Sequence, residues 1–567
     1  MYYRFGPYRL YLPALLLFRG EIPVRLTPKA LETLFVLVRN QGRMVSKQEL
    51  LREVWSSTFV DEGTLAHNVY EIRKALSDHG SDVPYCIETI SKKGYRFSAE
   101  VESCEEPPPV MSLAVLPFRG IGLAAHEDWL RIGLADAIIT RLANLRNLAV
   151  RPTSAVAKYA GQECDSCEAG KQLAATKVVE GVLQNSGGQF RLTLQLVDVD
   201  SRRAVWGGQF DECAADLPSL ENRAAQEVVV ALPVRVNEGD WKSVSKRHTE
   251  DLQAYQLRLR ARSMFYQPTP ARLCDSITLL RQAIQRDPNY ALAYSDLAYA
   301  YQFLAMFAFE RPSEVLPSAR SAAEKALRLD STLAEARAAL AFAQWHYDYE
   351  WAEAARQYRT LLDNVPNDAR MHLQYGMLLG ETGNVATSLI QFQKALELDP
   401  SFALLHASKA VVQCHARRFD EAIKSCMTAL RIDPECFRAH WMLGVAKVQK
   451  DQYRAAIQHF RHAAEIADNH PPALAGLVHA YARAGLRETA AKALHQLEQI
   501  SKQRYVPSDE MAVAYAGMGE INLAFKALFA AIEERSVHLV LAKGDPQFDA
   551  LRPDPRFGEV LRRIGLA

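Results

Sequence analysis

The chain has 567 residues, of which 49% are hydrophobic and 23% are charged, and its formal net charge is +1. This length predicts several domains, because single hydrophobic cores stop growing near roughly 250–300 residues. The balanced charge argues against a polybasic tail. The chain has no run of about 18 apolar residues, so no transmembrane helix is predicted. The nine cysteines are an odd number without a paired framework, which favours a reducing compartment. We therefore expect a cytoplasmic protein that does not contact a membrane.

Residues 1–26 alternate short apolar runs with Gly and Pro, which predicts a small N-terminal sheet. Thr27 followed by Pro28 marks the start of a first helix. Ser46, with Glu49 three residues later, has the capping-box pattern that starts a second helix. The first fifty residues therefore predict a sheet followed by two helices.

A third helix is expected from about residue 62 to residue 77, because apolar residues recur at helical spacing from Leu65 to Leu76. The hairpin that follows carries Lys92 and Lys93 at its tip and Arg96 in its returning strand. Opposite its apolar stripe the helix presents polar side chains, namely His67, Tyr70, Glu71 and Lys74, with Thr64, Asn68 and Arg73 on the flanks.

A sheet, three helices and a basic-tipped hairpin, in this order, resemble the OmpR/PhoB-type winged-helix DNA-binding domain, which includes CadC/ToxR-like regulators. The resemblance covers residues 3–101 and is carried by LTPKALETLFVLVRNQGRMVSKQELLREVW, VDEGTLAHNVYEIRKAL and ETISKKGYRF. It implies a domain over residues 1–101 that places its third helix in the major groove of double-stranded DNA. The wing is then expected to reach the minor groove or the backbone.

By position, the resemblance implies phosphate contacts from Thr64 and Asn68 and base contacts from Glu71 and Arg73. Arg can donate two hydrogen bonds to guanine, Glu can accept one from cytosine N4, and lysines on a wing can contact phosphates. The full set expected at the DNA is Thr64, His67, Asn68, Tyr70, Glu71, Arg73, Lys74, Lys92, Lys93 and Arg96.

The third helix also departs from the family pattern. Relatives carry several arginines along it, whereas this chain has Tyr70 and Glu71 at two of those places. Residues 1–100 hold 14 Lys and Arg against 11 Asp and Glu, so the domain is only weakly basic. Affinity per monomer is expected to be weak, which favours binding as a homodimer or at neighbouring sites.

Residues 102–110, ESCEEPPPV, predict a short semi-rigid linker. From Met111 the order βαβαβββ predicts a compact α/β domain over residues 111–238. AVLPF, GLADAIITRL, VVEGVLQ and LTLQLVDVDSRRAVWGGQFD resemble the TolB N-terminal-like or FlgO-like segment of bacterial regulators. We find no phosphate loop and no catalytic constellation, so no enzyme is expected. A rigid spacer or dimerisation unit is the favoured role, with ligand sensing as the alternative.

Pro366, Pro400 and Pro434 are each 34 residues apart, and each closes a helical stretch of the same pattern. A 34-residue period of paired helices is typical of a tetratricopeptide (TPR) array. Such a solenoid packs each repeat against its neighbours and presents an extended concave surface. About eight repeats are expected over residues 239–567, with residues 544–565 as a C-terminal cap.

In TPR proteins, positions 2, 5, 9 and 12 of the first helix of each repeat usually face the concave groove. In this chain these positions are mostly apolar and are edged by two arginines. We expect the groove to hold an apolar helix or extended segment, from a protein partner or from the chain's own winged helix, with Trp441 as its anchor. The candidate groove residues are Arg370, Leu373, Met377, Arg438, Trp441 and Val445.

His372, His406 and His440 recur at one repeat position. Equivalent positions of packed helices lie on the order of 10 Å apart, which is too far to share an ion with bonds of about 2 Å. These residues are therefore expected to pack between repeats. The pair Cys164 and Cys167 lacks the second pair that a structural zinc site needs, so no metal and no cofactor are predicted.

Together these patterns predict a multidomain protein with a winged helix (α+β), a small α/β domain and an all-α TPR solenoid. The favoured function is cytoplasmic, sequence-specific regulation of transcription, with the array binding a partner or self-associating to control the winged helix. The alternative is an interaction scaffold whose degenerate winged helix serves for docking. No receiver domain precedes the winged helix, so its signal is expected from the C-terminal side.

Overall fold

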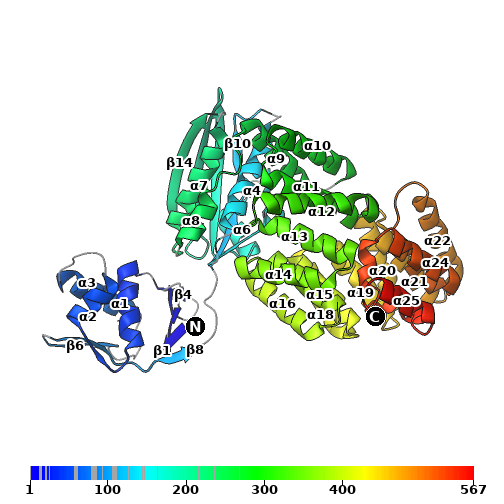
Figure 1. Ribbon diagram of the computed structural model, residues 1–567. Coiled ribbons are helices and arrows are strands. Elements are labelled where there is room, and N and C mark those ends of the chain that lie inside the picture. Colours follow the sequence, from blue (N-terminus) through cyan, green and yellow to red (C-terminus); the bar gives the residue numbers. More distant parts are fainter. Residues whose placement is uncertain are drawn as a thin grey trace. The chain divides into compact units, whose positions relative to one another are not determined.

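The computed structural model describes residues 2–11, 16–19, 22–24, 26–55, 62–77, 86–91, 93–104, 111–124, 127–143, 145, 147–161, 164–213, 216–234, 236–266 and 269–567. The chain forms two compact units, Met1–Val110 and Met111–Ala567 (Figure 1). The first is a winged helix, and the second holds a sheet-containing region and a helical array, which confirms the predicted fold class. Among the described residues, no helix combines the length and the apolar character that a membrane span requires.

The first unit begins with an antiparallel sheet in the order β4-β3-β2-β1-β8. Its last strand comes from the predicted linker, and there Glu102 lies opposite Arg4 and forms an ion pair with it. The prediction that a linker begins at residue 102 is therefore wrong, because residues 102–104 form the last strand of the sheet. The strands are β1 (Tyr2–Phe5), β2 (Tyr8–Tyr11), β3 (Leu16–Arg19), β4 (Ile22–Pro23) and β8 (Glu102–Cys104).

Three helices follow, and side chains cap the first two as their sequences predict. Thr27 accepts a hydrogen bond from the amide of Ala30 at the start of α1, and Ser46 accepts one from Glu49 at the start of α2. Fully buried Leu34, from the first helix, lies in the core that the three helices share. The helices are α1 (Pro28–Arg39), α2 (Lys47–Val54) and α3 (Glu62–Ser77).

A second sheet, in the order β5-β7-β6, forms the wing. Gly94 opens the returning strand, where a Cβ atom would lie 2.0 Å from the carbonyl oxygen of Val45. Only glycine permits this close approach of the two strands. The strands are β5 (Met44–Ser46), β6 (Ile87–Ile90) and β7 (Gly94–Phe97).

The second unit begins with a mixed sheet in the order β11-β9-β12-β13-β14, and β10 pairs with β12. The long hairpin that alternating residues predict is present as β12 and β13. Helices α4 and α7 bury their apolar residues in the core of this sheet. The elements are β9 (Met111–Val115), β10 (Arg119–Ile121), α4 (Leu130–Leu142), β11 (Leu148–Val150), α5 (Thr153–Val156), α6 (Ser166–Gln172), β12 (Lys177–Ser186), β13 (Gln189–Asp198), β14 (Arg203–Cys213), α7 (Leu217–Ala231) and α8 (Glu238–Ser245).

Paired helices then form the array (Figure 1). Bulky and small residues alternate between the helices of a repeat, as at Phe460, which is fully buried. A Cβ atom at Gly444 would lie 2.6 Å from this ring. The helices are α9 (Leu252–Ser263), α10 (Pro270–Arg286), α11 (Ala291–Met306), α12 (Pro312–Leu329), α13 (Ala334–Ala343), α14 (Trp351–Asn364), α15 (Ala369–Glu381), α16 (Val385–Leu398), α17 (Ala403–His415), α18 (Phe419–Ile432), α19 (Phe437–Val448), α20 (Tyr453–Ile466), α21 (Pro471–Arg483), α22 (Arg487–Ser501), α23 (Ser508–Met518) and α24 (Ile521–Glu533).

The C-terminal segment folds back onto earlier repeats. It comprises the 3-10 helices η6 (Val537–Leu541) and η7 (Pro546–Leu551) and the helix α25 (Pro555–Arg563). Trp351, on the third helix pair, donates a hydrogen bond of 2.7 Å to the carbonyl of Ile564. Arg417, after α17, donates one of 3.0 Å to the carbonyl of Gly544. The segment therefore packs against repeats far from the end of the array.

One buried arginine joins the sheet region to the array. Arg262, on α9, lies 2.5 Å from the carboxylate of Asp136 on α4 and 2.6 Å from that of Asp296 on α11. The same guanidinium lies 3.0 Å from Glu335 on α13. Arg258, one turn earlier, pairs with Asp296 at 2.6 Å. These ion pairs connect four helices of both regions.

Apolar contacts and a further hydrogen bond also join the sheet region to the array. Tyr255 and Leu259, on α9, are buried in the core of the sheet region. Arg151, after β11, donates to the carbonyl of Leu398 at the end of α16. The expected domain boundary between residues 238 and 239 is therefore not a boundary in packing, and residues 111–567 form a single compact unit.

Two neighbouring carboxyl groups are buried beneath η6. Asp509 and Glu510, at the start of α23, are each 4% exposed. Ser536 donates a hydrogen bond to Asp509, and Nδ1 of His538 lies 3.1 Å from Glu510. Burial raises the pKa of Asp509 to about 7 and the pKa of Glu510 to about 8. Both carboxyls therefore retain protons far above the pH at which an exposed carboxyl loses its own.

The variant Arg262→Ala should destabilise the second unit strongly. It removes the cation from buried Asp136, leaves buried Asp296 with Arg258 alone, and unpairs half-buried Glu335, and breaking a buried pair costs about 3–5 kcal/mol. Arg320→Ala is the matched control, because Arg320 pairs with Glu324 and Asp348 at a half-exposed site and should cost less than about 1 kcal/mol. Urea unfolding followed by circular dichroism measures both, and equal losses would contradict the role of Arg262.

The stability of the second unit should fall as the pH rises from about 5 to about 8. The unfolded chain releases the protons of Asp509 and Glu510 near pH 4, whereas the folded chain holds them to about pH 7 and 8. The folded state therefore binds more protons across this window, and each carboxyl contributes a slope of up to roughly 1.4 kcal/mol per pH unit.

The double variant Asp509→Asn/Glu510→Gln should flatten this pH dependence and raise the melting temperature at pH 8. Glu488→Gln, at an exposed position of α22, is the control and should leave the profile unchanged. A melting temperature that rises with pH in the native protein would contradict the assignment.

Candidate functional site

The outer face of α3 is the first candidate site. Leu65, Val69 and Ile72 are buried on its inner face, as their spacing predicts. His67 and Lys74 are exposed on the opposite side, and Tyr70 retains 60% of its surface exposed. A tyrosine held this far out of the core is available for contact with another molecule.

Two other predicted contact residues take part in the same surface. Thr64 is exposed near the start of α3, where helix amides favour a phosphate. Glu71 is half-buried, one residue after Tyr70. Both positions are compatible with the contacts that the resemblance implies.

Asn68 and Arg73 lie differently from what the sequence predicts. Asn68 is only 7% exposed, so its side chain is covered on the flank of the helix. Arg73 donates from Nη2 to the carbonyl of Ile87 at 2.8 Å and to the hydroxyl of Thr89 at 2.7 Å. Helical periodicity places both residues on the flanks of the helix, but the wing packs against the flank that carries Arg73. In this structure, Arg73 therefore links α3 to β6 instead of projecting toward solvent.

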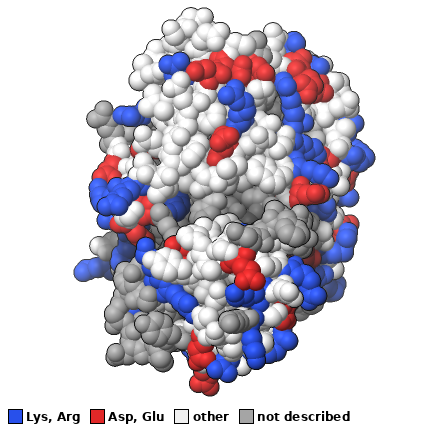
Figure 2. All heavy atoms as spheres, turned by 90° about the vertical axis from the view of Figure 1, so that its left-hand side faces the viewer, with Lys and Arg blue, Asp and Glu red and all other residues white. Residues whose placement is uncertain are grey.

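The wing carries the remaining predicted residues. Lys93 is exposed at the turn between β6 and β7, whereas Lys92 lies outside the described residues. Arg96 forms an ion pair across the wing with Glu88, with 3.0 Å between Nε and the carboxylate. On the face shown in Figure 2, basic and acidic side chains alternate among the coloured residues.

The second candidate site is a cavity of about 740 Å3 on the concave side of the array. It is lined by the first helices of successive repeats, from α9 to α19, and by η6. Helix α4 of the sheet region lines it from the other side. The concave surface is therefore covered by other parts of the chain, which sequence periodicity could not indicate.

Four of the six predicted groove residues line this cavity, namely Arg370, Leu373, Met377 and Arg438. The other two belong to the core, since Trp441 is 7% exposed and Val445 is 2% exposed. The ring of Trp441 lies 6.0 Å from that of His538 in η6. The expectation that Trp441 is an open anchor for a partner is wrong for this conformation, because the chain's own C-terminal segment covers it.

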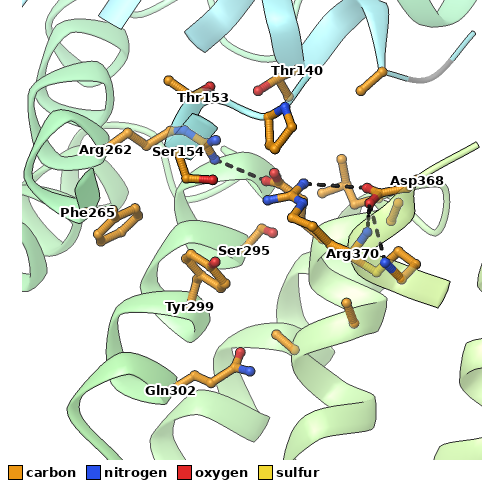
Figure 3. A pocket seen from close by; sticks show the side chains of 18 of the residues that line it. Thr140, Thr153, Ser154, Arg262, Phe265, Ser295, Tyr299, Gln302, Asp368 and Arg370 are labelled. Carbon is orange, nitrogen blue, oxygen red and sulfur yellow. Dashed lines mark hydrogen bonds and ion pairs between the residues drawn. The ribbon is translucent and has the colours of Figure 1, made fainter. Parts of the chain in front are cut away.

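Charged side chains meet at one end of the cavity (Figure 3). Arg262 lies 3.0 Å from the carboxylate of Glu335, and Arg370 pairs with Asp368 at 3.4 Å. Although burial alone would raise it, the two arginines lower the pKa of Glu335. This end of the cavity is therefore an internally paired network of charges.

One face of α11 forms the neighbouring wall. Ser295, Tyr299 and Gln302 lie at helical spacing on that face and project into the cavity (Figure 3). Ser295 is buried, and its hydroxyl makes no hydrogen bond within the described part of the chain. The wall thus offers polar groups that are free to bind a ligand.

The recurring histidines make contacts within the array. Nε2 of His372 lies 2.9 Å from the carbonyl of Pro366, and Nε2 of His440 lies 3.0 Å from that of Pro434. The ring of His406 likewise forms a hydrogen bond with the backbone of Pro400. Each histidine therefore contacts the proline that closes the preceding repeat.

In the described residues, Asp509, Glu510 and His538 could hold a metal ion by distance alone, since their ligand atoms lie within 4.8 Å of one another. The raised pKa values, about 7 for Asp509 and about 8 for Glu510, favour the protonated carboxyls near neutral pH, whereas metal ligands must be deprotonated. The absence of a metal in this protein stays a prediction.

Comparison with known families assigns three parts of the chain. Residues 21–97 match the family "transcriptional regulatory protein, C terminal", and residues 110–226 match the second domain of HilA/YgeH-like transcriptional regulators. Residues 350–401 and 413–471 match the tetratricopeptide repeat. The expected likeness of the middle region to a TolB-type segment is not confirmed.

Individual relatives agree with these assignments. The transcriptional regulator HilA of Salmonella typhi is 26% identical over 415 residues, which is 72% of each chain. The transcriptional activator CadC of Escherichia coli is 30% identical over 102 residues, 16% of this chain and 20% of that protein. The solved DNA-binding domain of E. coli CadC is 26% identical, covering 18% of this chain and 94% of that one, with a TM-score of 0.17.

These similarities support a DNA-binding regulator with a protein-interaction domain, and they point to regulation rather than catalysis. The chain carries an OmpR/PhoB-type winged-helix domain, a middle region similar to the second domain of HilA/YgeH-like regulators, and a C-terminal TPR array.

Proposed function

We propose that this protein is a sequence-specific regulator of transcription whose first unit binds duplex DNA through α3 and the wing. The observation that carries the proposal is the outer face of α3, where Tyr70 and Lys74 stand exposed on a helix whose apolar stripe is fully packed. An α-helix of this kind fits the major groove of B-DNA.

Within this proposal the side chains of the interface divide by role. His67, Tyr70, Glu71 and Lys74 face the base edges, and Thr64 contacts a phosphate at the start of the helix. Lys92 and Lys93 contact phosphates from the wing, because a turn carrying two cations binds the backbone without reading its sequence.

Arg73 takes a positioning role in place of the base contact that the sequence predicts. Its bonds to Ile87 and Thr89 hold the wing against α3, so it sets the distance between the two DNA-contacting elements. Asn68 supports the buried side of the same helix.

The array supplies the interaction surface of the regulator. Its concave side is covered by α4 and η6, so we assign protein partners to the outer helices. Ile390 and Met427 are at least half exposed there, on α16 and α18. A protein partner or a second copy of the chain bound to this face would bring the DNA-binding units together, which compensates for weak binding by one monomer.

The alternative is an interaction scaffold that does not bind DNA, and its support is the weakly basic composition of residues 1–100 together with Glu71 on α3. Salt-dependent binding to DNA from the chain's own upstream region separates the two functions, because phosphate contacts release counterions. Binding without salt dependence, or no binding, favours the scaffold.

The double variant Lys92→Ala/Lys93→Ala should weaken binding to all DNA sequences alike. Two lost phosphate contacts reduce the slope of log K against log salt by up to about 2. Glu71→Ala should instead relax the preference at one base pair by about 1–3 kcal/mol. Fluorescence anisotropy over a salt series measures both changes.

Arg4→Ala is the control for lost positive charge. Arg4 lies on β1, in the N-terminal sheet and outside α3 and the wing (Figure 1), where it pairs with Glu102. This variant should bind like the native protein. Native affinity and slope in the wing variant would refute the assignment of the wing.

A further inference from the structure

The cavity on the concave side has the size of a small-molecule site. Its volume of about 740 Å3 lies within the range of roughly 300–1,000 Å3 that is usual for ligand pockets. It lies wholly within the second unit and is separate from the DNA-binding surface. Neither the DNA-binding proposal nor the family similarities assign it an occupant.

Among the arginines that line the cavity, Arg438 is the one that pairs with no carboxylate in the described part of the chain. Arg262, Arg370 and Arg141 line it, and each pairs with at least one carboxylate. Arg438, on α19, also lines it but makes no ion pair or hydrogen bond with the described residues. Burial lowers the pKa of Arg438, which reflects the cost of keeping this charge away from water.

The nearest acidic group does not supply the missing charge. Glu381, on α15, is buried and accepts a hydrogen bond of 2.9 Å from Nε1 of Trp345. Burial raises its pKa well above the usual range despite the influence of Arg438. Burial thus favours the protonated form of Glu381, whose O–H can donate a hydrogen bond to an anion held by Arg438.

Aromatic rings form another part of the lining. The rings of Tyr299 and Phe303 lie 4.4 Å apart, and those of Phe342 and His346 stack at 3.9 Å. All four residues line the cavity. Ser408, also in the lining, is fully buried, and its hydroxyl has no partner within the described residues. A planar apolar body would bury its faces against these rings.

We propose that the concave cavity binds a small aromatic carboxylate, with the carboxylate on Arg438 and Glu381 and the ring against Tyr299, Phe303 and Phe342. A single guanidinium matches a carboxylate in geometry and in charge. A phosphate dianion favours two cations together, and Arg370, which also lines the cavity, already pairs with Asp368. The bound ligand would lie partly buried beneath α4 and η6. It would therefore contact both the sheet region and the array.

The test is isothermal titration of the full chain with naphthoate, in the absence of DNA. Naphthylmethanol and naphthyl phosphate are the comparison probes, since they share the ring and change the polar group. We expect naphthoate to bind at one site per chain, with the alcohol and the phosphate each at least about tenfold weaker, the cost of losing one charge-assisted contact. Because DNA is absent, the outcome is independent of the DNA-binding proposal.

Variants at Arg438 assign the site. Arg438→Gln should weaken naphthoate binding at least about tenfold, and Arg438→Lys should retain most of it. Arg454→Gln removes the same charge from an exposed position of α20 in the same repeat and should bind like the native protein. Unchanged melting temperatures of all three variants establish that the fold is kept.

Three outcomes would overturn the proposal. They are no binding of naphthoate up to millimolar concentration, equal affinity for the alcohol, and native affinity in a folded Arg438→Gln. Tighter binding of the phosphate would replace the carboxylate class by an organic phosphate and would equally refute the proposal as stated.

Discussion

The second unit depends on one buried guanidinium. Arg262 holds carboxylates from α4, α11 and α13 within 3.0 Å, and these helices belong to regions that the sequence suggests are separate. Buried charges of this kind tolerate little displacement, because each carboxylate would otherwise lie in a low-dielectric interior without its cation. The sheet region is therefore fixed to the first repeats, and it acts as the first layer of the array.

This attachment changes what the array can do. An isolated TPR solenoid presents its concave surface to partners, but here α4 covers one side of that surface and the returning C-terminal segment covers another. The surface becomes a cavity suited to a small molecule. The outer helices of the array remain as the surface for a protein partner. The DNA-binding helix and its wing belong to a separate unit.

Local features of the fold are predictable from the sequence because their causes are local. The caps at Thr27 and Ser46, the buried stripe of α3 and the small-against-bulky packing at Phe460 follow from residues close in the chain or one period apart. The 34-residue period also places Arg370 and Arg438 on the concave side correctly.

The remaining features depend on contacts between distant segments. Asn68 is buried on a flank of α3, Arg73 bonds to the wing, and Trp441 lies beneath a segment about a hundred residues later in the chain. Nothing in the spacing of these residues indicates what covers them. The strand β8 was assigned to a linker for the same reason, since its pairing partner is β1 at the other end of the unit.

Native-state hydrogen exchange on the full chain tests the attachment of the two regions most directly. If Arg262 joins them into one unit, the slowest amides of α4 and α11 exchange through the same opening, with equal free energies and equal dependence on denaturant. Exchange of α4 through an opening of lower free energy, while α11 stays protected, would show that the sheet region opens independently and would contradict the account.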